Sequence, residues 1–331
     1  MSFKLLGVGS PLIDFSLDVT DSFLAGKVPG GKGGTRNITA EEKNALLAGF
    51  TGRISRTPGG SAANTVRIFA ALSGQAAFFG KTGDDDDGRF FRDSLTAAGV
   101  DDRWLVSDRD HSTGFCVSLI TPDAERTMLS GLGASVKISD SDIGRTDFSG
   151  FSTVLVEGYL CGEKWMDELL AKARAAGCRI ALDLNNFELV AKIRPRFRQL
   201  LESGIDLLFA NGQELAALYP GASGEAERHR LISRQVPLAV IKYGKDGSIV
   251  LHGNDLFRID AEKNICVRDT TGAGDFYAAG FLYGLSRGAD LRKCGHLGSV
   301  CAAAIIRITG AVLDKEELDK LYNIIKREVE L

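Results

Sequence analysis

The sequence predicts an α/β protein with a doubly wound, mainly parallel sheet, helices on both faces of that sheet, and a small β-sheet lid. Three observations lead to this fold class. Strand-like apolar runs alternate with amphipathic helical stretches along most of the chain, as in parallel sheets with helical crossovers. Two segments, 11–57 and 112–130, break the alternation. The chain has 331 residues, and a length beyond the usual size of one core favours an appended unit.

The elements of the large unit are predicted from apolar runs and their end signals. KLLGVG (4–9) predicts a strand that ends in glycine. SAANTVRIFAALSG (61–74) predicts a helix, because its apolar residues recur at helical spacing between the N-cap Ser61 and the stop Gly74. Further strands are expected at 76–80, 153–158, 179–184, 206–211 and 237–244. Further helices are expected at 87–99, 163–176, 187–202, 212–218, 225–234, 273–286, 289–308 and 314–329.

The two irregular segments predict the lid. TGFCVSLITPDAERTML, within 112–130, alternates in polarity and turns at TPDAE, so we expect a β-hairpin there. The segment 11–57 contains the strand-like DFSLDV and the glycine-rich VPGGKGGTRN. We interpret VPGGKGGTRN as a mobile loop, with an anion-binding loop as the alternative. The rest of the chain, 1–10, 58–111 and 131–331, is expected to form the α/β domain that binds nucleotide and substrate.

The aromatic residues of the lid leave the nature of a bound acceptor open. They could form the flat apolar walls of a purine pocket, or they could fill a small core within the lid. A sugar pocket would need hydrogen-bonding groups instead. The lid phenylalanines are Phe15, Phe23, Phe50 and Phe115.

Composition and charge exclude several classes of protein. A formal net charge of −3 gives no general attraction to nucleic acid or to anionic membranes. No uncharged apolar run reaches the roughly 18 residues of a membrane span. Pro11 and Asp14 interrupt the N-terminal apolar run too early for a signal peptide. The six cysteines are scattered without metal-binding spacing, which favours reduced thiols and a cytoplasmic location.

The stretch DTTGAGDFYAAGF (269–281) predicts a reactive centre. At the start of a helix, the amides of Gly272, Ala273 and Gly274 would point together at an anion. The negative charge of Asp275, in the first turn, would repel a phosphate that is only bound there and not transferred. Asp275 can instead deprotonate a hydroxyl that attacks a phosphate, while the amides stabilise charge on the transferring oxygens. On this segment alone, the alternative is a capped helix with an acidic first turn.

Other glycine-rich stretches fit known phosphate-binding motifs poorly. GQAAFFGKT (74–82) has five residues between its glycines where a P-loop has four, and carboxylates follow where a phosphate would lie. GVGSPL and GLGASV both lack the third glycine of the dinucleotide fingerprint. A P-loop enzyme and a dinucleotide-dependent oxidoreductase are therefore disfavoured.

Four stretches together resemble the ribokinase (PfkB) family of carbohydrate and nucleoside kinases. They occur in the order of the family and span most of the chain: PGGSAANTVRIFAALSG with FFGKTGDDDDG (58–88), NGQE (211–214), KYGKDG (242–247) and DTTGAGDFYAAGF (269–281). The N-terminal GSPLIDFSLDVTDSFL and the long insert at 20–57 look most like the adenosine-kinase-like branch.

The resemblance implies transfer of the γ-phosphoryl group of ATP, with Mg²⁺, to a hydroxyl of a sugar or nucleoside. It implies that Asp275 is the catalytic base and that Gly272, Ala273 and Gly274 form the anion hole. The residues implied to hold the acceptor are Asp14, Gly60 and Asn64. Those implied to lie near the nucleotide and Mg²⁺ are Asn211, Glu214, Lys242, Gly244 and Gly247. Asp269 and the carbonyl of Thr271 match positions of a monovalent-cation site, which would take K⁺.

Several alternatives stay open. Lys242 and Gly247 could serve only a hairpin, and Glu157 and Arg126 could be either solvated charges or ligand contacts. Asp183 lies at the carboxyl end of a strand, where ligands bind, but it lacks the basic residue that follows in relatives, so we do not assign it.

A catalytically silent sugar or nucleoside sensor is the alternative function, and an oxidoreductase is the third class. An exposed lid face could be covered by a second copy of the chain, which would give a homodimer.

Overall fold

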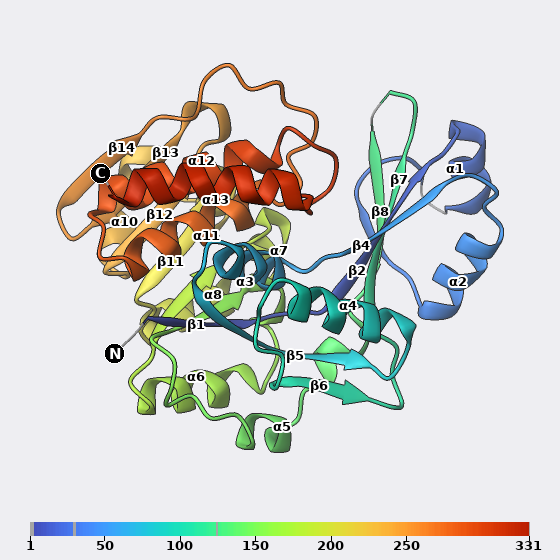
Figure 1. Ribbon diagram of the computed structural model, residues 1–331, viewed down its shortest axis with the longest axis horizontal. Helices are drawn as coiled ribbons and strands as arrows, with labels where there is room; N and C mark the ends of the chain where they lie inside the picture. The colour runs from blue at the N-terminus through green and yellow to red at the C-terminus, as the bar shows by residue number, and fades with distance from the viewer. Residues whose placement is uncertain (1–2, 29–30, 124, 331) are drawn as a thin grey trace.

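The computed structural model describes residues 3–28, 31–123 and 125–330, and its larger part is built around one twisted sheet (Figure 1). The sheet has nine strands, which pair in parallel except for the antiparallel pairs β12–β13 and β13–β14. In spatial order they are β14 (Asp255–Ile259), β13 (Ser248–His252), β12 (Leu238–Lys242), β11 (Leu207–Asn211), β10 (Arg179–Asp183), β9 (Thr153–Glu157), β1 (Lys4–Val8), β5 (Gln75–Gly83) and β6 (Leu105–Asp108).

Helices cover both faces of this sheet, because successive strand residues point to opposite sides and nearly all of them are apolar. Leu5 belongs to one buried cluster and Leu6 to the other. The first cluster includes α3 (Ser61–Ala71), α4 (Asp86–Ala97), α11 (Ala273–Ser286), α12 (Leu291–Ile305) and α13 (Lys315–Glu330). The second includes α5 (Asp140–Gly144), α6 (Met166–Ala175), α7 (Phe187–Lys192), α8 (Arg194–Glu202), α9 (Gly212–Leu218) and α10 (Glu225–Ser233). The predicted fold class is confirmed.

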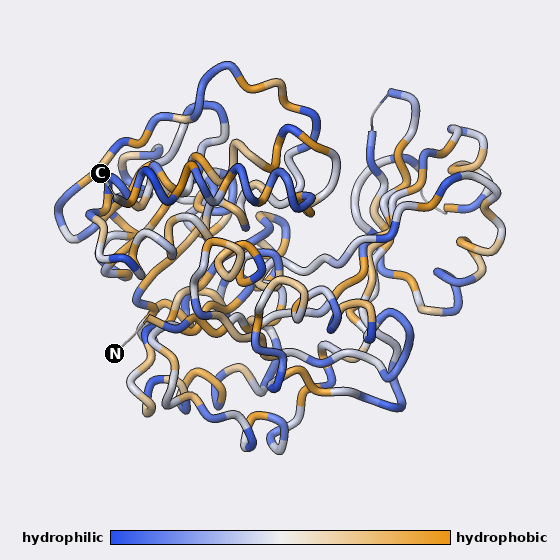
Figure 2. The backbone as a smooth tube through the Cα atoms, in the orientation of Figure 1, coloured by the Kyte–Doolittle hydropathy of each residue, from blue (hydrophilic) through white to orange (hydrophobic). Residues whose placement is uncertain are grey.

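The outermost helix illustrates how the sequence pattern sets the packing. Along α13, polar and apolar residues alternate in blue and orange in Figure 2, at helical spacing. Leu321 and Ile325 are buried on the inner side, whereas Ile324 is 48% exposed. Helices packed on one face need only such a stripe.

Some elements differ from those predicted. The helix expected over 187–202 is interrupted at Ile193, because Pro195 lies in the first turn of a new helix, α8, and cannot continue the old one. The residues 242–247 do form a hairpin, since β12 and β13 pair across them, yet Lys242 also faces the cavity described below.

A second, five-stranded sheet contains strands from both predicted lid segments. Its spatial order is β3 (Thr35–Asn37), β8 (Arg126–Gly131), β7 (Gly114–Ile120), β2 (Leu12–Asp18) and β4 (Ile54–Pro58). The hairpin expected within 112–130 is present as the antiparallel pair β7–β8. Ala124, in its expected turn, and Pro29 and Gly30, in the expected glycine-rich loop, lie outside the described residues. The lid boundaries and its movement stay predictions.

The apolar side chains of the small sheet, which we call the lid core, are buried in the same cluster as those of α3 and α11. Two short helices that we did not predict, α1 (Asp21–Lys27) and α2 (Ala40–Ala48), pack on it. Phe15 and Phe115 are buried, and the amine of Lys43 on α2 lies about 5 Å from both ring centres. Of the two roles left open for these phenylalanines, they therefore fill the lid core.

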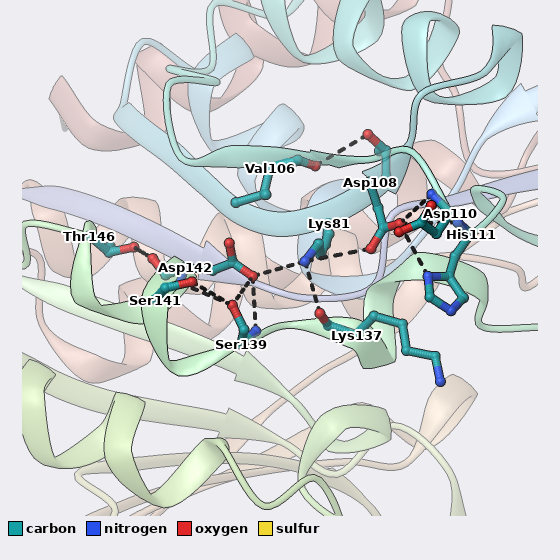
Figure 3. Close-up of polar contacts among 11 residues, drawn as sticks. Lys81, Val106, Asp108, Asp110, His111, Lys137, Ser139, Ser141, Asp142 and Thr146 are labelled. Carbon is teal, nitrogen blue, oxygen red and sulfur yellow. Dashed lines mark hydrogen bonds and ion pairs between the residues drawn. The ribbon is translucent and has the colours of Figure 1, made fainter.

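An ion-pair cluster fixes the chain where it leaves the large sheet for β7 (Figure 3). Lys81 on β5 donates to Asp142 Oδ2 (2.9 Å) and to the backbone oxygen of Lys137 (2.9 Å), and lies 3.6 Å from Asp108 Oδ2. Asp108 also accepts a hydrogen bond from the amide of His111. These side chains are largely buried, so separating the charges would be costly. The cluster thus anchors the start of the lid hairpin.

Within the described ranges, no helix is long and apolar enough to cross a membrane.

Candidate active site

The candidate active site lies where the carboxyl ends of parallel strands meet the start of α11. β10, β11 and β12 end in Asp183, Asn211 and Lys242. These residues line a cavity of about 1130 Å³ together with residues 272–275. Open α/β sheets bind ligands at this edge.

Asp275 lies in the first turn of α11, and two side chains of α3 hold its carboxylate. Oδ1 accepts a hydrogen bond from Ser61 Oγ (2.6 Å), and Oδ2 accepts one from Asn64 Nδ2 (2.8 Å). Burial raises the pKa of Asp275 to about 6, although both hydrogen bonds act to lower it. A carboxylate that is mostly ionised at neutral pH, but with a pKa near neutrality, is suited to general-base catalysis.

The backbone amides of Gly272, Ala273 and Gly274, the predicted anion hole, lie at the start of α11, where the amide of Ala273 donates to the carbonyl oxygen of Thr270 (3.2 Å). Gly272 has φ +77°, and a Cβ there would lie 2.9 Å from the Cβ of Ala311, so both the turn and the packing require glycine. A Cβ on Gly274 would lie 3.1 Å from Lys242 Nζ. The lysine charge therefore adjoins the helix N-terminus, and both attract phosphate.

Asn64 and Ser61 connect the predicted base to side chains that sequence reasoning missed. Arg67 donates to Asn64 Oδ1, and Asn185 Nδ2 donates to Ser61 Oγ (2.7 Å). Both ends of the Asn64 carboxamide are thus bonded, Oδ1 to Arg67 and Nδ2 to Asp275. Its contact with an acceptor stays a prediction.

Asp14, on β2, has no hydrogen-bond or ion-pair partner among the described residues. Burial raises its pKa to about 6, against the opposing charge of Arg67. Its carboxylate lies against Gly59, where a Cβ would be 2.3 Å from Oδ2. Gly60 has φ +87°, and a Cβ there would be 2.4 Å from the oxygen of Ser10. A half-buried carboxylate without protein donors is available to ligand hydroxyls.

Glu157 ties two segments of the site together. Its Oε1 accepts from the amide of Ser10 (2.7 Å), and its Oε2 accepts from the amide of Ala62 (3.2 Å). Burial raises the pKa of Glu157 to about 7, although these hydrogen bonds lower it. Tyr159, two residues on, is 41% exposed. Glu157 therefore joins the β1–β2 connection to the first turn of α3.

Charged groups gather on the other wall of the cavity. Lys242 Nζ donates to Asp183 Oδ2 (3.0 Å). Asn211 and Glu214 form a reciprocal capping box at the start of α9, with three hydrogen bonds of 2.7–2.8 Å between them. Burial and the charge of Asp183 raise the pKa of Glu214 to about 7. Burial alone would lower the pKa of Lys242, but the Asp183 and Glu214 carboxylates raise it.

Two glycines shape the cavity beyond Lys242. Gly244 and Gly247 have φ +58° and +83°, and a Cβ on Gly247 would lie 2.1 Å from the oxygen of Ile259. The cavity wall here is partly apolar, with Val267 and Ile306 among its residues. A nucleotide needs such a combination of open backbone for phosphates and apolar wall for its base.

Asp269 and Thr271, predicted for a cation site, are bonded to the lid. Arg126 on β8 lies 2.8 Å from Asp269 Oδ2 through one nitrogen and donates to Thr271 Oγ1 (2.7 Å) through another. From the sequence, Arg126 could have been either a solvated charge or a ligand contact; in the structure it bonds to Asp269 and Thr271.

The structure brings most of the predicted residues to one place. The following line the large cavity: Asn211, Glu214, Lys242, Gly244, Gly247, Gly272, Ala273, Gly274 and Asp275. Asn64 joins them through its bond to Asp275, whereas Asp14 and Gly60 lie at the lid side of α3. The individual roles of these residues stay predictions.

Asp183, Ser61 and Asn185 belong to the same network and were not assigned to the site. The prediction of Ser61 as an N-cap was wrong, because Ser61 is the first residue of α3 and Gly60 is its N-cap. A signal was present for all three. DLNN, which contains Asp183 and Asn185, begins at the last residue of the buried strand β10, and Ser61 lies between the glycines and Asn64 of the N-terminal motif.

Comparison with known proteins now identifies the family. Residues 41–318 match the model of the pfkB family of carbohydrate kinases. The chain belongs to the pfkB family. As a member of it, the protein is a sugar or nucleoside kinase, which is a phosphotransferase and not the oxidoreductase kept as an alternative.

Relatives of this pfkB protein act on different acceptors. The 5-dehydro-2-deoxygluconokinase of Shouchella clausii is 30% identical over 75% of this chain and 80% of its own. The aminoimidazole riboside kinase of Salmonella typhimurium is 28% identical over 83% of this chain and 88% of its own.

Solved structures extend the similarity to the whole fold. Adenosine kinase from Sinorhizobium meliloti has a TM-score of 0.86 and 31% identity to this chain. The alignment covers 98% of this chain and 100% of the adenosine kinase chain. A probable sugar kinase from Rhizobium etli CFN 42 has a TM-score of 0.85 and 29% identity, covering 98% of this chain and 99% of its own.

Proposed function

We propose that the protein transfers the γ-phosphoryl group of ATP to a hydroxyl of a sugar or nucleoside, with Asp275 as the base. The observation that carries the proposal is the place of Asp275 in the first turn of α11, beside the anion hole, with a pKa raised to about 6. Asp14 supports it as well, because its carboxylate has no protein partner and can accept hydrogen bonds from ring hydroxyls.

The chain's residues would act as follows. Asp275 accepts the proton of the acceptor hydroxyl, and the freed oxygen forms a bond to the γ-phosphorus. The bond from that phosphorus to the β–γ bridging oxygen breaks, and ADP leaves with the bonding electrons. The amides of the anion hole and the Lys242 charge stabilise the negative charge on the transferring group. Positioning and electrostatics supply the catalysis.

Two carboxylates make the cavity wall a fitting place for Mg²⁺. Asp183 and Glu214 lie close enough for the charge of Asp183 to raise the pKa of Glu214, and a nearby dication would relieve this repulsion. In the described part of the chain, no group of three or more His, Cys, Asp or Glu side chains could hold a metal. We infer that Mg²⁺ arrives with ATP and is held here largely through water, where it neutralises phosphate charge.

A nucleoside and a free sugar would make different contacts with the site. Phe15 and Phe115 are unavailable as pocket walls because they are buried in the lid core. We take Tyr159 as the aromatic wall, because it is 41% exposed and follows the site residue Glu157 by two positions. A nucleoside base would therefore pack against Tyr159, whereas a free sugar would need only hydrogen-bonding groups.

A phosphotransfer assay with ATP and a panel of ribose, fructose and nucleosides tests the proposal. We expect ADP release that depends on one acceptor class. If that acceptor is a nucleoside, Tyr159→Ala should raise its KM, and a free sugar should show no such change. Binding of an acceptor without transfer would instead support the silent sensor, which nothing in the intact base and anion hole favours.

Location and assembly are further proposals. All six cysteines are free thiols, which fits a reducing cytoplasm supplied with ATP. A homodimer through the lid is supported by β4, an edge strand on which Ile54 is 37% exposed. Light scattering during gel filtration would measure the molar mass.

A further inference from the structure

The end of the lid hairpin contacts the turn that leads into the anion hole through one arginine. Arg126, the first residue of β8, pairs with Ile120 at the end of the hairpin ladder. Its guanidinium lies 2.8 Å from Asp269 Oδ2 and donates to Thr271 Oγ1 (2.7 Å). Thr271 Oγ1 in turn donates to Asp269 Oδ1 (2.8 Å). The three side chains close a ring, and two of them belong to the turn that directly precedes Gly272.

The Asp269 carboxylate already has a full set of donors. Oδ1 accepts from the amide (2.9 Å) and the hydroxyl (2.8 Å) of Thr271. Oδ2 accepts from the amide of Gly310 (2.9 Å) and from Arg126. A carboxylate has about four lone-pair sites, so none is left. Burial alone would raise the pKa of Asp269, but these bonds, with that from Arg126 first, lower it to about 2.

A monovalent cation therefore does not fit this carboxylate as the chain is arranged. K⁺ on Asp269 and the carbonyl of Thr271 was expected from the resemblance. A guanidinium already neutralises the carboxylate, whose side chain is only 4% exposed, and a second cation beside it would be repelled. The surroundings of Asp269 therefore do not fit the K⁺ ion that the resemblance implied.

We propose that Arg126 takes the place of the monovalent cation at Asp269, so that lid closure and not K⁺ sets the anion hole. Arg126 acts as a positioning residue, because it holds Thr271 and Asp269 and, through the chain, the amide of Gly272. The lid can then order the hole only when it is closed. The proposal rests on the proposed role of the hole in phosphoryl transfer.

The lid offers a matched control for this contact. Arg56 on β4 also bridges the lid and the large domain, with one nitrogen 2.6 Å from Asp87 Oδ1. Both arginines are about one-third exposed, at 36% and 35% of the side chain. Only Arg126 touches the turn before α11. A general effect of holding the lid would appear in variants of both residues, and an effect on the anion hole only in variants of Arg126.

The first test uses the unaltered protein. Its phosphotransfer rate is measured in K⁺ and in tetramethylammonium at equal ionic strength. We expect equal kcat in the two salts, and strong activation by K⁺ would overturn the proposal.

The second test compares Arg126→Met with Arg56→Met. In tetramethylammonium, kcat of Arg126→Met should fall by about tenfold, less than the 10²–10³-fold that loss of a direct oxyanion donor costs. Adding K⁺ or millimolar guanidinium should restore part of it. Arg56→Met should show no response to either cation. Unchanged kcat in Arg126→Met, or a loss that neither cation reverses, would contradict the proposal.

A binding measurement keeps the test independent of the acceptor and of turnover. The Tm of Arg126→Met should rise with K⁺ relative to tetramethylammonium, because K⁺ can then occupy Asp269. The unaltered protein and Arg56→Met should show no such difference. If no acceptor is phosphorylated but this pattern holds, the proposed function fails while the cation replacement stands. If K⁺ changes the Tm of all three proteins equally, the proposal that Arg126 replaces the cation is wrong.

Discussion

At the scale of single residues, the site is dominated by carboxyl groups that are withdrawn from water. Burial raises the pKa of Asp14 and of Asp275 to about 6, and that of Glu157 to about 7. Each is kept partly ionised by hydrogen bonds or by a nearby guanidinium. Their protonation therefore changes within the range of ordinary buffers, and activity should follow pH.

Asp275→Asn removes proton acceptance while keeping the size of the side chain. Loss of a general base costs about 10²–10⁴-fold, so we expect kcat to fall by that factor with little change in the affinity for ATP. Steady-state kinetics and nucleotide binding measure the two effects. Turnover close to that of the unaltered protein would remove Asp275 from the proposed mechanism.

Asn64→Ala should change the pH profile as well as the rate. The base must be ionised, so kcat/KM of the unaltered protein should fall below about pH 6, the pKa of Asp275. The hydrogen bond from Asn64 lowers that pKa. Without it the pKa rises, and the acidic limb should move to higher pH. A raised acceptor KM with an unmoved limb would mean that Asn64 serves the acceptor and not the base.

At the scale of elements, prediction from sequence worked where the signals are local. The helix expected at 273–286 has those bounds, because glycines start it and its apolar residues continue it. Short α1 and α2 were not predicted, since neither carries a clear amphipathic stripe. The break at Ile193 could have been predicted from Pro195, because proline is tolerated in the first turn of a helix but not in its interior.

In the site as well, residues with a local sequence signal could be predicted and residues joined by long-range contacts could not. Asp275 and the glycines before it lie in one stretch of sequence, so their chemistry could be predicted from it. Ser61 bonds to Asp275 across 214 positions, and Arg126 to Thr271 across 145. No local pattern records such contacts, because they depend on how the lid and α3 meet α11. The same holds for Lys242 and Asp183.

The start of α11 gives a prediction with a close control. Gly272→Ala and Gly288→Ala both place a side chain at positive φ, +77° and +74°, where alanine costs about 1–2 kcal/mol. Only the Cβ at position 272 meets another atom, that of Ala311 at 2.9 Å. Both variants should lose similar stability in urea titrations, with a somewhat larger loss at 272. The value of kcat should fall strongly only in Gly272→Ala. Equal kcat in the two variants would mean that the anion hole does not contribute to catalysis.

At the scale of the whole molecule, the lid is expected to close on the acceptor. An efficient kinase must keep water from the γ-phosphoryl group, so its site should assemble around the bound alcohol. Amide hydrogen exchange in 113–120 should slow when a phosphorylated acceptor is added without ATP. Equal exchange with and without that acceptor would show that the lid does not close on it.

The order of strands in the small sheet limits how this protein can be re-engineered or can have diverged. β8 and β7 lie between β3 and β2, so strands from one chain segment separate those of the other. Among the described residues, β3 pairs with β8 alone, and β2 lies between β7 and β4. Neither of the two segments, 11–57 and 112–130, can form the complete five-stranded sheet without the other. A graft of new acceptor specificity from a homologue must therefore transplant both segments at once, and single-segment chimeras should yield insoluble protein.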